Sequence, residues 1–265
     1  MIIDCHAHVG NMGGRVWTPQ ELLAQMDEAG VDYSLLITLE EQQENKQLTI
    51  EEIIQVCEKF PRLIPVGRID YNDSIKEQTD KLIGYLKEKK IVGVKFYLGY
   101  QKYHANDSKL HPIYKFCQEN NFPVMYHTGM LETGFPGLLK SSHPLTIDEV
   151  ADAFPDLIII IAHMGNPWIM DCAAVMLKNR NVYMDFSAYF TEYAPIKDAD
   201  TEFFVKRLSE VKFFLGDFKK CLFGTDWPLY SQKEYLNAVQ KLPMTDEEKE
   251  LVFRKNAKEI FNLKV

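Results

Sequence analysis

The stretch that decides the fold stands at the beginning of the chain and reads Ile2-Ile3-Asp4-Cys5-His6-Ala7-His8. Its apolar start predicts a strand, and the strand continues into two histidines instead of the glycine-rich loop that follows the first strand of a nucleotide-binding sheet. Because side chains alternate along a strand, we expect Asp4, His6 and His8 to share one face and Cys5 to pack against the helices. This beginning favours a closed barrel over an open, doubly wound sheet.

Short apolar runs like the first one recur along the whole chain. They predict strands at residues 2–6, 33–38, 63–69, 92–97, 123–127, 157–163, 182–186 and 221–225. The stretches between them carry apolar residues at helical spacing, for example Phe204, Leu208 and Val211. Eight units in 265 residues leave about 33 residues for each unit of strand, helix and loops. We therefore predict that residues 1–265 form a single α/β domain, a (β/α)8 TIM barrel with an additional C-terminal helix at 244–263.

Six sites combine a serine or threonine with a glutamate three residues later, which is the pattern of a capping box at a helix N-terminus. The pairs are Thr18 with Glu21, Thr49 with Glu52, Ser74 with Glu77, Thr146 with Glu149, Ser231 with Glu234 and Thr245 with Glu248. Each pair predicts where a helix begins.

Charge, cysteine usage and hydropathy restrict the cellular setting. Thirty lysines and arginines against 38 aspartates and glutamates give a formal net charge of −8, which disfavours binding to nucleic acid or to an anionic membrane. The five cysteines stand singly, without a CxxC pair, as expected in a reducing compartment. The longest apolar run, 157–162, is far shorter than the roughly 20 residues that cross a bilayer, and no cleavable leader is recognised. We expect a cytoplasmic protein.

Polar side chains gather where several of the predicted strands end. His6 and His8 belong to the first strand, His127 ends the fifth, His163 ends the sixth, and Asp226 follows the eighth. The carboxyl ends of barrel strands meet at one opening, so these side chains should converge there. A single histidine at a strand end usually has a structural role. Structural roles do not explain why four histidines and an aspartate should all stand at the same opening. Imidazoles with a carboxylate are typical ligands of Zn²⁺ or a similar divalent ion, with one position left open for water.

Motifs spread over nearly the whole chain resemble one known family. They are Ile3-Asp-Cys-His-Ala-His8, Ala29-Gly-Val-Asp32, Gly93-Val-Lys-Phe96, Pro123-Val-Met-Tyr-His-Thr-Gly129, Ala162-His-Met-Gly165 and Phe223-Gly-Thr-Asp-Trp-Pro228, with a similar tail from Thr245 to Phe261. The chain thus resembles the amidohydrolase superfamily, and within it the amidohydrolase-related family that includes aminocarboxymuconate-semialdehyde decarboxylase. Asn166 departs from the family pattern, in which a second glycine often occupies this position.

The resemblance implies a role for each of these residues. It makes His6, His8, His127 and Asp226 the ligands of one divalent ion, with zinc favoured and manganese as the alternative, and it makes Asp226 and His163 the catalytic residues. Some branches of the superfamily carboxylate a lysine of the fourth strand to bridge two metals, and Lys95 stands at the end of that strand. We favour an unmodified Lys95 whose ammonium binds a substrate carboxylate or pairs with a neighbouring acid.

The implied chemistry is that of a metal-dependent hydrolase acting on a small carbonyl substrate, an amide, ester or lactone of an organic acid. A divalent ion lowers the pKa of a water to about 7, Asp226 takes its proton, and His163 stabilises or protonates the oxyanion. The alternative is non-oxidative decarboxylation of an unsaturated or aromatic acid, which also occurs in the family. Less favoured are a TatD-type deoxyribonuclease, which should have a glutamate ligand near Lys95, and a non-catalytic barrel that binds a small acid.

Further residues near the strand ends are candidates for contact with the substrate. The predicted substrate-binding residues are Lys95, Arg68, Tyr97, Trp168, Trp227 and His104, and Arg15, Trp17 and Tyr189 lie in similar loops. Arg15 is equally well explained as a solvated surface residue, and His111 and His143 are expected to be structural or exposed. The expected partner is a small molecule, and the family resemblance implies a homodimer.

Overall fold

A parallel sheet of eight strands forms the centre of the computed structural model, which describes residues 1–39 and 47–265. The strands are β1 (Ile3–Ala7), β4 (Tyr33–Ile37), β5 (Leu63–Arg68), β6 (Val94–Phe96), β7 (Val124–Tyr126), β8 (Ile159–Ile161), β9 (Val182–Asp185) and β10 (Cys221–Leu222). They follow one another in the sheet in chain order, and each pairs in parallel with the next. All eight predicted strands are confirmed.

The sheet closes on itself between β1 and the segment that begins with β10. The Cys5 amide donates to the Phe223 carbonyl at 2.8 Å, and the Asp226 amide donates to the His6 carbonyl at 2.7 Å. Ala7 also forms a parallel bridge to Trp227. The predicted (β/α)8 TIM barrel is therefore confirmed, and an open doubly wound sheet is excluded.

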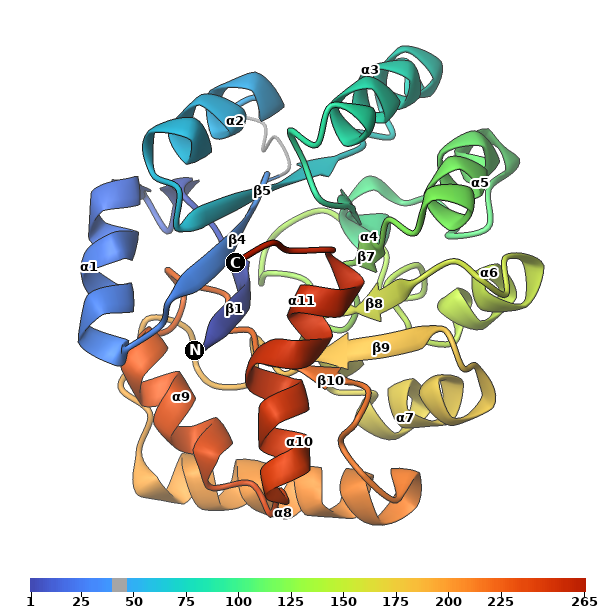
Figure 1. Ribbon diagram of the computed structural model, residues 1–265. Coiled ribbons are helices and arrows are strands. Elements are labelled where there is room, and N and C mark those ends of the chain that lie inside the picture. Colours follow the sequence, from blue (N-terminus) through green and yellow to red (C-terminus); the bar gives the residue numbers. More distant parts are fainter. Residues whose placement is uncertain (40–46) are drawn as a thin grey trace.

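Helices surround the barrel and alternate with its strands (Figure 1). They are α1 (Pro19–Ala29), α2 (Ile50–Lys59), α3 (Ile75–Lys87), α4 (Leu98–Gln101), η1 (Ser108–Leu110), α5 (His111–Asn120), α6 (Thr146–Ala153), η2 (Ala162–Gly165), α7 (Ile169–Lys178), α8 (Asp198–Leu215) and α9 (Gln232–Gln240). The predicted C-terminal helix is present as α10 (Asp246–Glu250), a π-helical turn η3 (Leu251–Lys255) and α11 (Asn256–Ile260). Figure 1 shows α11 lying across one opening of the barrel.

Three of the predicted capping boxes form with both reciprocal hydrogen bonds, at Thr18, Thr49 and Thr245. The Ser231 side chain accepts the amide of Glu234, but the Glu234 carboxylate does not accept the Ser231 amide in return. At Ser74 the predicted helix start is confirmed, because Ser74 is the N-cap of α3, but the capping box does not form. At Thr146 the prediction is wrong. Ser74 makes no side-chain cap, and Thr146 already lies inside α6, where its hydroxyl donates to the His143 carbonyl at 2.8 Å.

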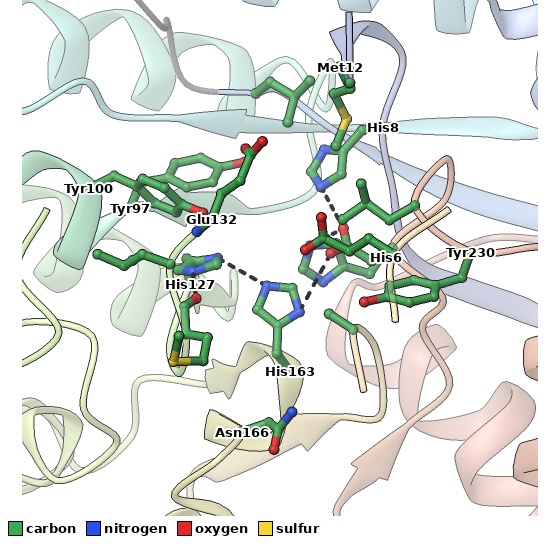
Figure 2. A pocket seen from close by; sticks show the side chains of 18 of the residues that line it. His6, His8, Met12, Tyr97, Tyr100, His127, Glu132, His163, Asn166 and Tyr230 are labelled. Atoms are coloured by element: carbon green, nitrogen blue, oxygen red, sulfur yellow. Dashed lines mark hydrogen bonds and ion pairs between the residues drawn. The ribbon is translucent and has the colours of Figure 1, made fainter. Parts of the chain in front are cut away.

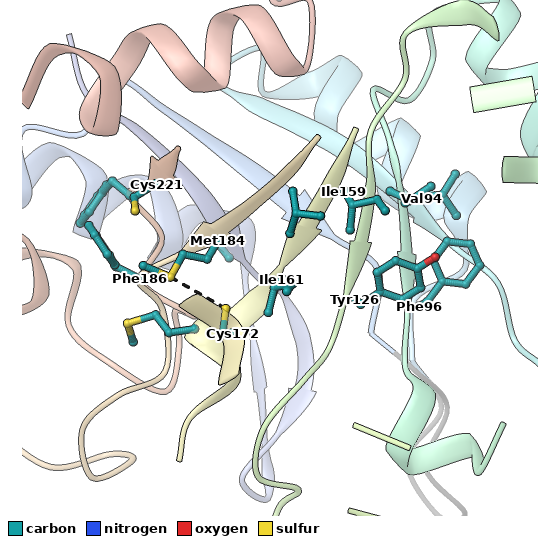
Figure 3. Close-up of a cluster of buried hydrophobic side chains, with 14 of the residues drawn as sticks. Val94, Phe96, Tyr126, Ile159, Ile161, Cys172, Met184, Phe186 and Cys221 are labelled. Atoms are coloured by element: carbon teal, nitrogen blue, oxygen red, sulfur yellow. Dashed lines mark hydrogen bonds between the residues drawn. The ribbon is translucent and has the colours of Figure 1, made fainter. Parts of the chain in front are cut away.

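Strand residues contribute to two separate apolar clusters, one on each side of the sheet. The outer cluster, which includes Phe96, Tyr126 and Met184, packs against the surrounding helices (Figure 3). The inner cluster combines strand residues such as Ile37 and Val66 with residues 257–261 at the end of the chain. Because the strands are buried on both sides, their sequences read as nearly continuous apolar runs.

A β-bulge in β1 interrupts the expected alternation of side chains. Asp4 pairs with Ser34 whereas Ala7 pairs with Leu36, so β1 uses one residue more than β4 over the same distance. Cys5 consequently belongs to the inner cluster. The expectation that Cys5 packs against the helices is wrong, although its role as a buried packing residue is retained.

Asp4 lies on the opposite side of the sheet from the expected one. Its carboxylate accepts hydrogen bonds from Gln232 Nε2 of α9 at 2.7 Å and from Thr225 Oγ1 at 2.6 Å. The expectation that Asp4 shares a face with His6 is therefore wrong, because the bulge reverses the direction of the strand residues between them.

A short antiparallel hairpin, which no pattern in the sequence predicted, follows β1. It consists of β2 (Gly10–Met12) and β3 (Arg15–Trp17), and Met12 and Gly13 reach the cavity described below. Within residues 1–39 and 47–265, no helix combines the length and apolar character needed to span a bilayer.

Candidate metal centre

The predicted metal ligands and catalytic residues converge on one cavity of about 280 Å³ at the carboxyl ends of the strands. His6, His8, His127, His163 and Asp226 all line this cavity. Figure 2 shows the four histidines directed toward the same space, and they come from the ends of three strands, β1, β7 and β8. Four of these residues are buried and at most 6% exposed, namely His6, His8, His163 and Asp226. The sequence-based expectation of convergence is thus met by the geometry.

Uncommon backbone conformations direct two of these side chains. His163 and Asp226 have φ angles of 61° and 65°, in the left-handed region that residues other than glycine seldom adopt. Gly129, with φ of 89°, lets the loops after β7 and β8 touch, because a Cβ there would lie 2.2 Å from the Asn166 carbonyl oxygen. That carbonyl accepts the Met130 amide at 2.8 Å. Asn166, the departure from the family pattern, therefore links the two loops through its backbone.

Hydrogen bonds fix which ring nitrogens of His6 and His8 face the cavity. His6 Nδ1 donates to Asp185 Oδ2 at 2.8 Å, and His8 Nδ1 donates to the Ile37 carbonyl at 2.9 Å. Both rings therefore present Nε2 to Asp226 Oδ1, at 3.5 Å from His6 and 3.0 Å from His8. A nitrogen lone pair and a carboxylate oxygen repel each other unless a cation lies between them. These residues fit a divalent ion.

His163 and His127 complete the group of donors. Ligand atoms of His6, His163 and Asp226 all lie within 4.8 Å of one another. His127 Nε2 donates to the Met130 carbonyl at 3.0 Å, and His127 Nδ1 lies 3.0 Å from His163 Nε2. Of the four residues predicted as metal ligands, His6 and Asp226 belong to this donor group in the described part of the chain, and His163 joins them. His8 contacts the group through Asp226, and His127 contacts it through His163.

Burial keeps three of the histidines, His6, His127 and His163, neutral, which is the form that binds a metal ion. It lowers the pKa of His6, an effect that the Lys95 ammonium strengthens, and it lowers the pKa of His127 to about 3. Burial also lowers the pKa of His163 well below its usual value. For Asp226, burial opposes the charge, but the surrounding histidines outweigh burial and hold the pKa of its carboxyl well below the usual range. The site therefore combines neutral imidazoles with an ionised carboxylate.

Lys95, on β6, brings a buried ammonium into the group of donors. Its Nζ lies 3.1 Å from His6 Nε2, and the side chain is completely buried. Burial lowers the pKa of Lys95 to about 8, while Asp185 and Asp226 favour its charged form. The ammonium thus lies at the cavity wall, beside the donor atoms.

The remaining predicted substrate-binding residues divide into two groups. Tyr97 lines the cavity, as does Tyr189, whereas the four others are not among the lining residues in the described part of the chain. Arg68 Nη1 lies 3.7 Å from Asp70, the Trp168 ring lies 4.6 Å from that of His143, the Trp227 ring lies 5.5 Å from that of Trp17, and the exposed His104 lies 3.7 Å from Glu149. Arg15 is exposed and covers the Trp17 ring, and His111 bonds to Asn106 at 3.0 Å.

Several residues of the site were not predicted. Asp185 and Ser187 lie behind His6 and His163, and the cavity is also lined by Glu132, Glu192, Tyr100, Tyr193 and Tyr230. A signal for Asp185 and Ser187 is present in the sequence, because the predicted strand 182–186 ends among polar residues as the other site strands do. The glutamates and tyrosines lie in long loops, where no periodic pattern marks them.

The fold and the cavity together define a class of protein, the (β/α)8 barrels that place imidazoles and a carboxylate for a divalent ion at their strand ends. The model of the amidohydrolase family matches residues 3–263, almost the whole chain. The chain therefore belongs to the amidohydrolase family, and the resemblance seen in its motifs is confirmed. No curated protein matches the sequence.

Solved structures with the same fold cover nearly the whole chain. An uncharacterised TIM-barrel protein from Bordetella bronchiseptica is 22% identical, with a TM-score of 0.78 and 98% of each chain covered. An amidohydrolase from Burkholderia multivorans with bound zinc is 14% identical, with a TM-score of 0.76 and 99% of each chain covered. A 5-carboxyvanillate decarboxylase from Sphingomonas paucimobilis is 15% identical, with a TM-score of 0.72 and 99% of each chain covered. At these identities the likeness shows the fold alone.

Proposed function

We propose that the protein is a metal-dependent hydrolase that attacks a small carbonyl substrate, an amide, ester or lactone, with activated water. The observation that carries this proposal is the convergence of four histidines and Asp226 in one cavity, with two Nε2 atoms facing the carboxylate. The proposed ion is zinc, with manganese as the alternative, and the proposed ligands are His6, His8, His127 and Asp226. The zinc in the related amidohydrolase from Burkholderia multivorans supports this choice.

The roles proposed for the protein residues are supported by their placement. When bound, the ion lowers the pKa of a water to about 7 and so supplies hydroxide at neutral pH. Asp226, ionised and beside the donors, accepts the proton of the water and returns it to the leaving group. His163 is the second proton-transfer residue, and its Nδ1 lies 3.9 Å from Asp226 Oδ2. It stabilises or protonates the substrate oxygen that becomes negatively charged.

The charged groups of the cavity wall indicate the charge of the substrate. Lys95 lies beside the histidines, Glu132 and Glu192 lie at the exposed rim, and no arginine lines the cavity within residues 1–39 and 47–265. Burial raises the pKa of Glu192, and the nearby carboxylates of Glu132 and Asp226 raise it further. A substrate carboxylate beside Lys95 is therefore matched by the ammonium charge, whereas a second substrate carboxylate at the rim is repelled by Glu132 and Glu192. The proposed substrate is uncharged or carries one carboxylate.

Replacing Glu192 with glutamine tests this charge preference. We expect kcat/KM for a dicarboxylate substrate to rise roughly fivefold, which corresponds to about 1 kcal/mol of relieved repulsion. The matched substrate that lacks the second carboxylate should react at an unchanged rate. Steady-state kinetics on the two substrates measure the difference, with Glu202→Gln on α8, outside the cavity, as the control variant. An equal change for both substrates would contradict the assignment of Glu192.

Decarboxylation of an unsaturated or aromatic acid is the second candidate function. It is favoured by Lys95, because a buried ammonium 3.1 Å from His6 Nε2 can hold the carboxylate that leaves as carbon dioxide. The structural likeness to a 5-carboxyvanillate decarboxylase supports keeping this candidate.

One experiment distinguishes the two candidates. The zinc-loaded protein is incubated with amides, esters and lactones of monocarboxylic acids and, separately, with unsaturated and aromatic acids. Hydrolysis of esters and lactones is recorded as acid release at constant pH, hydrolysis of amides as liberated amine, and decarboxylation as dissolved carbon dioxide. We expect the amides, esters or lactones to be hydrolysed by the wild type and not by Asp226→Asn. Carbon dioxide from the second set alone would replace hydrolysis with decarboxylation, and stoichiometric zinc with recovery of every ligand unchanged would favour a binding protein.

A further inference from the structure

Large apolar side chains are exposed on two neighbouring helices, α7 and α8, outside the cavity. They are Met170 and Leu177 of α7 and Phe203 and Phe214 of α8. The two helices pack against each other on the outside of the barrel (Figure 1). None of the four residues lines the cavity. Exposed apolar groups gathered on adjacent helices are typical of an interaction surface.

The α8 part of this surface is a stripe of four residues along the helix. Side chains turn by about 100° per residue, so Phe203, Arg207, Glu210 and Phe214 point in nearly the same direction. Within the stripe, Arg207 Nη1 lies 3.4 Å from Glu210 Oε2. The stripe thus has a phenylalanine at each end and two opposite charges in the middle.

The stripe points outward and toward α7. The opposite side of α8 faces α9, because Val205 and Lys206 line one groove together with Lys241, which follows α9. A third direction faces the barrel and is taken by the buried residues of α8, such as Leu208. Phe213 is seven residues after Lys206, or about two turns, so it shares the α9 side and lies outside the stripe.

The apolar residues of α7 lie on the edge that faces α8. Met170 and Leu177 are seven residues apart and therefore share one side of their helix. The edge toward α6 is marked by Lys178, whose ammonium donates to Asp148 of α6 at 2.8 Å. We call Met170, Leu177 and the α8 stripe together the α7–α8 surface.

We propose that the α7–α8 surface binds a second copy of this chain, with α8 of one copy antiparallel to α8 of its partner. The inference does not depend on the proposed function. A twofold axis between residues 208 and 209 places each stripe residue opposite the one that is equally far from the axis in the partner helix. Phe203 then meets the partner's Phe214, and Arg207 meets the partner's Glu210.

The order of the charges selects this arrangement. The twofold axis repeats the contact between Arg207 and the partner's Glu210, so two attractive pairs form in the middle and a pair of phenylalanines flanks them on each side. A parallel arrangement in register would instead place like charges against each other. A uniformly apolar partner would bury both charges without a counter-charge from its own side. The stripe is therefore complementary to itself.

Sedimentation velocity of the full chain at about 1 to about 100 µM tests for the dimer. We expect the wild type to dimerise with a Kd of roughly 10 µM, because the surface is small. Phe203→Ser should raise the Kd at least about tenfold. The matched control is Phe213→Ser, which removes a phenylalanine that is 92% exposed but lies on the α9 side, and it should dimerise like the wild type. Circular dichroism verifies that each variant is folded.

Exchanged charges test the geometry of the pairing. Arg207→Glu and Glu210→Arg each place like charges opposite one another at the axis, so each variant alone should be monomeric at about 100 µM. Mixed in equal amounts, the two variants should form a heterodimer, because positions 207 and 210 of one variant then face the opposite charge in the other. A dimer that appears only on mixing cannot arise from a change within one chain. The double variant Arg207→Glu with Glu210→Arg should also dimerise.

Several outcomes would overturn the inference. They are a wild type that remains monomeric at about 100 µM, charge variants that dimerise alone, and a mixture that stays monomeric. Cosedimentation of a monomeric wild type with phosphatidylcholine vesicles, lost in Phe203→Ser, would also overturn it and assign the α7–α8 surface to a lipid. Because no substrate is involved, these results do not depend on whether hydrolysis is observed.

Discussion

Asp226→Ala and His6→Ala are each expected to lower bound zinc from about one ion per chain to less than about a tenth of that. Each variant removes one of the donor atoms that lie within 4.8 Å of one another in the cavity. Asp226→Ala also removes the carboxylate that faces His6 Nε2 and His8 Nε2, so a negative charge that would balance the ion is lost. Elemental analysis of protein purified without chelator measures the content.

The control for this prediction is a histidine outside the cavity. The side chain of His104 is 52% exposed and lies 3.7 Å from Glu149, so His104→Ala should retain the wild-type zinc content. Circular dichroism of each variant excludes unfolding as the cause of a loss. Wild-type zinc content in His6→Ala, or equal loss in His104→Ala, would remove the basis of the metal assignment.

The same measurement separates the roles of His127 and His163. The family resemblance makes His127 a ligand and His163 a catalytic residue, while the distances place His163 within the donor group. We expect His127→Ala to lose zinc, and His163→Ala to keep it while losing activity by about 10²- to 10⁴-fold. Loss of zinc in His163→Ala would instead make His163 a ligand.

Glu248→Gln is expected to destabilise the fold by about 3 kcal/mol at pH 7. Glu248 lies in the first turn of α10 and is 2% exposed. One carboxylate oxygen accepts the Phe218 amide at 2.9 Å, and the other accepts Lys212 Nζ of α8 at 2.7 Å. The glutamate therefore ties α8, α10 and the segment before β10 together.

The pH dependence of this effect follows from the pKa of Glu248. Burial alone would raise this pKa, but the bonds from Lys212, Thr245 and Phe218 lower it from 4.5 to about 2. Because the pKa in the folded protein is lower than in the unfolded chain, the stabilisation is present above pH 4.5 and is lost as the pH falls toward 2. Urea denaturation at several pH values should show the difference between wild type and Glu248→Gln shrinking over that range.

The neighbouring glutamate provides a matched control. Glu247 pairs with Lys219 at 3.3 Å, but its side chain is 66% exposed, so solvent screens the interaction. Glu247→Gln should change the free energy of unfolding by less than about 0.5 kcal/mol. Equal effects of the two substitutions, or an effect of Glu248→Gln that does not vary with pH, would contradict the role given to Glu248.

Local sequence patterns were sufficient for the strands and for most helix starts. Each strand is an apolar run buried on both sides, and the threonine caps at Thr18, Thr49 and Thr245 satisfy backbone groups within four residues. The same pattern located the helix start at Ser74 without forming the cap, and at Thr146 the helix begins one residue earlier than predicted. A cap depends on the direction in which the preceding loop enters the helix, and that direction is set by tertiary packing.

The sequence by itself determined the barrel and the convergence of His6, His8, His127, His163 and Asp226, because every strand of a parallel barrel ends at the same opening. Only the tertiary structure decided the bulge that sends Cys5 inward and Asp4 outward, since strand register depends on the partner strand. It also decided which loop side chains reach the cavity, and it placed Asp185 and Ser187 behind the histidines. Those contacts join residues far apart in the sequence, by 179 positions between His6 and Asp185 and by 181 between His6 and Ser187. No local periodicity encodes them, because loop positions follow from how the completed barrel packs.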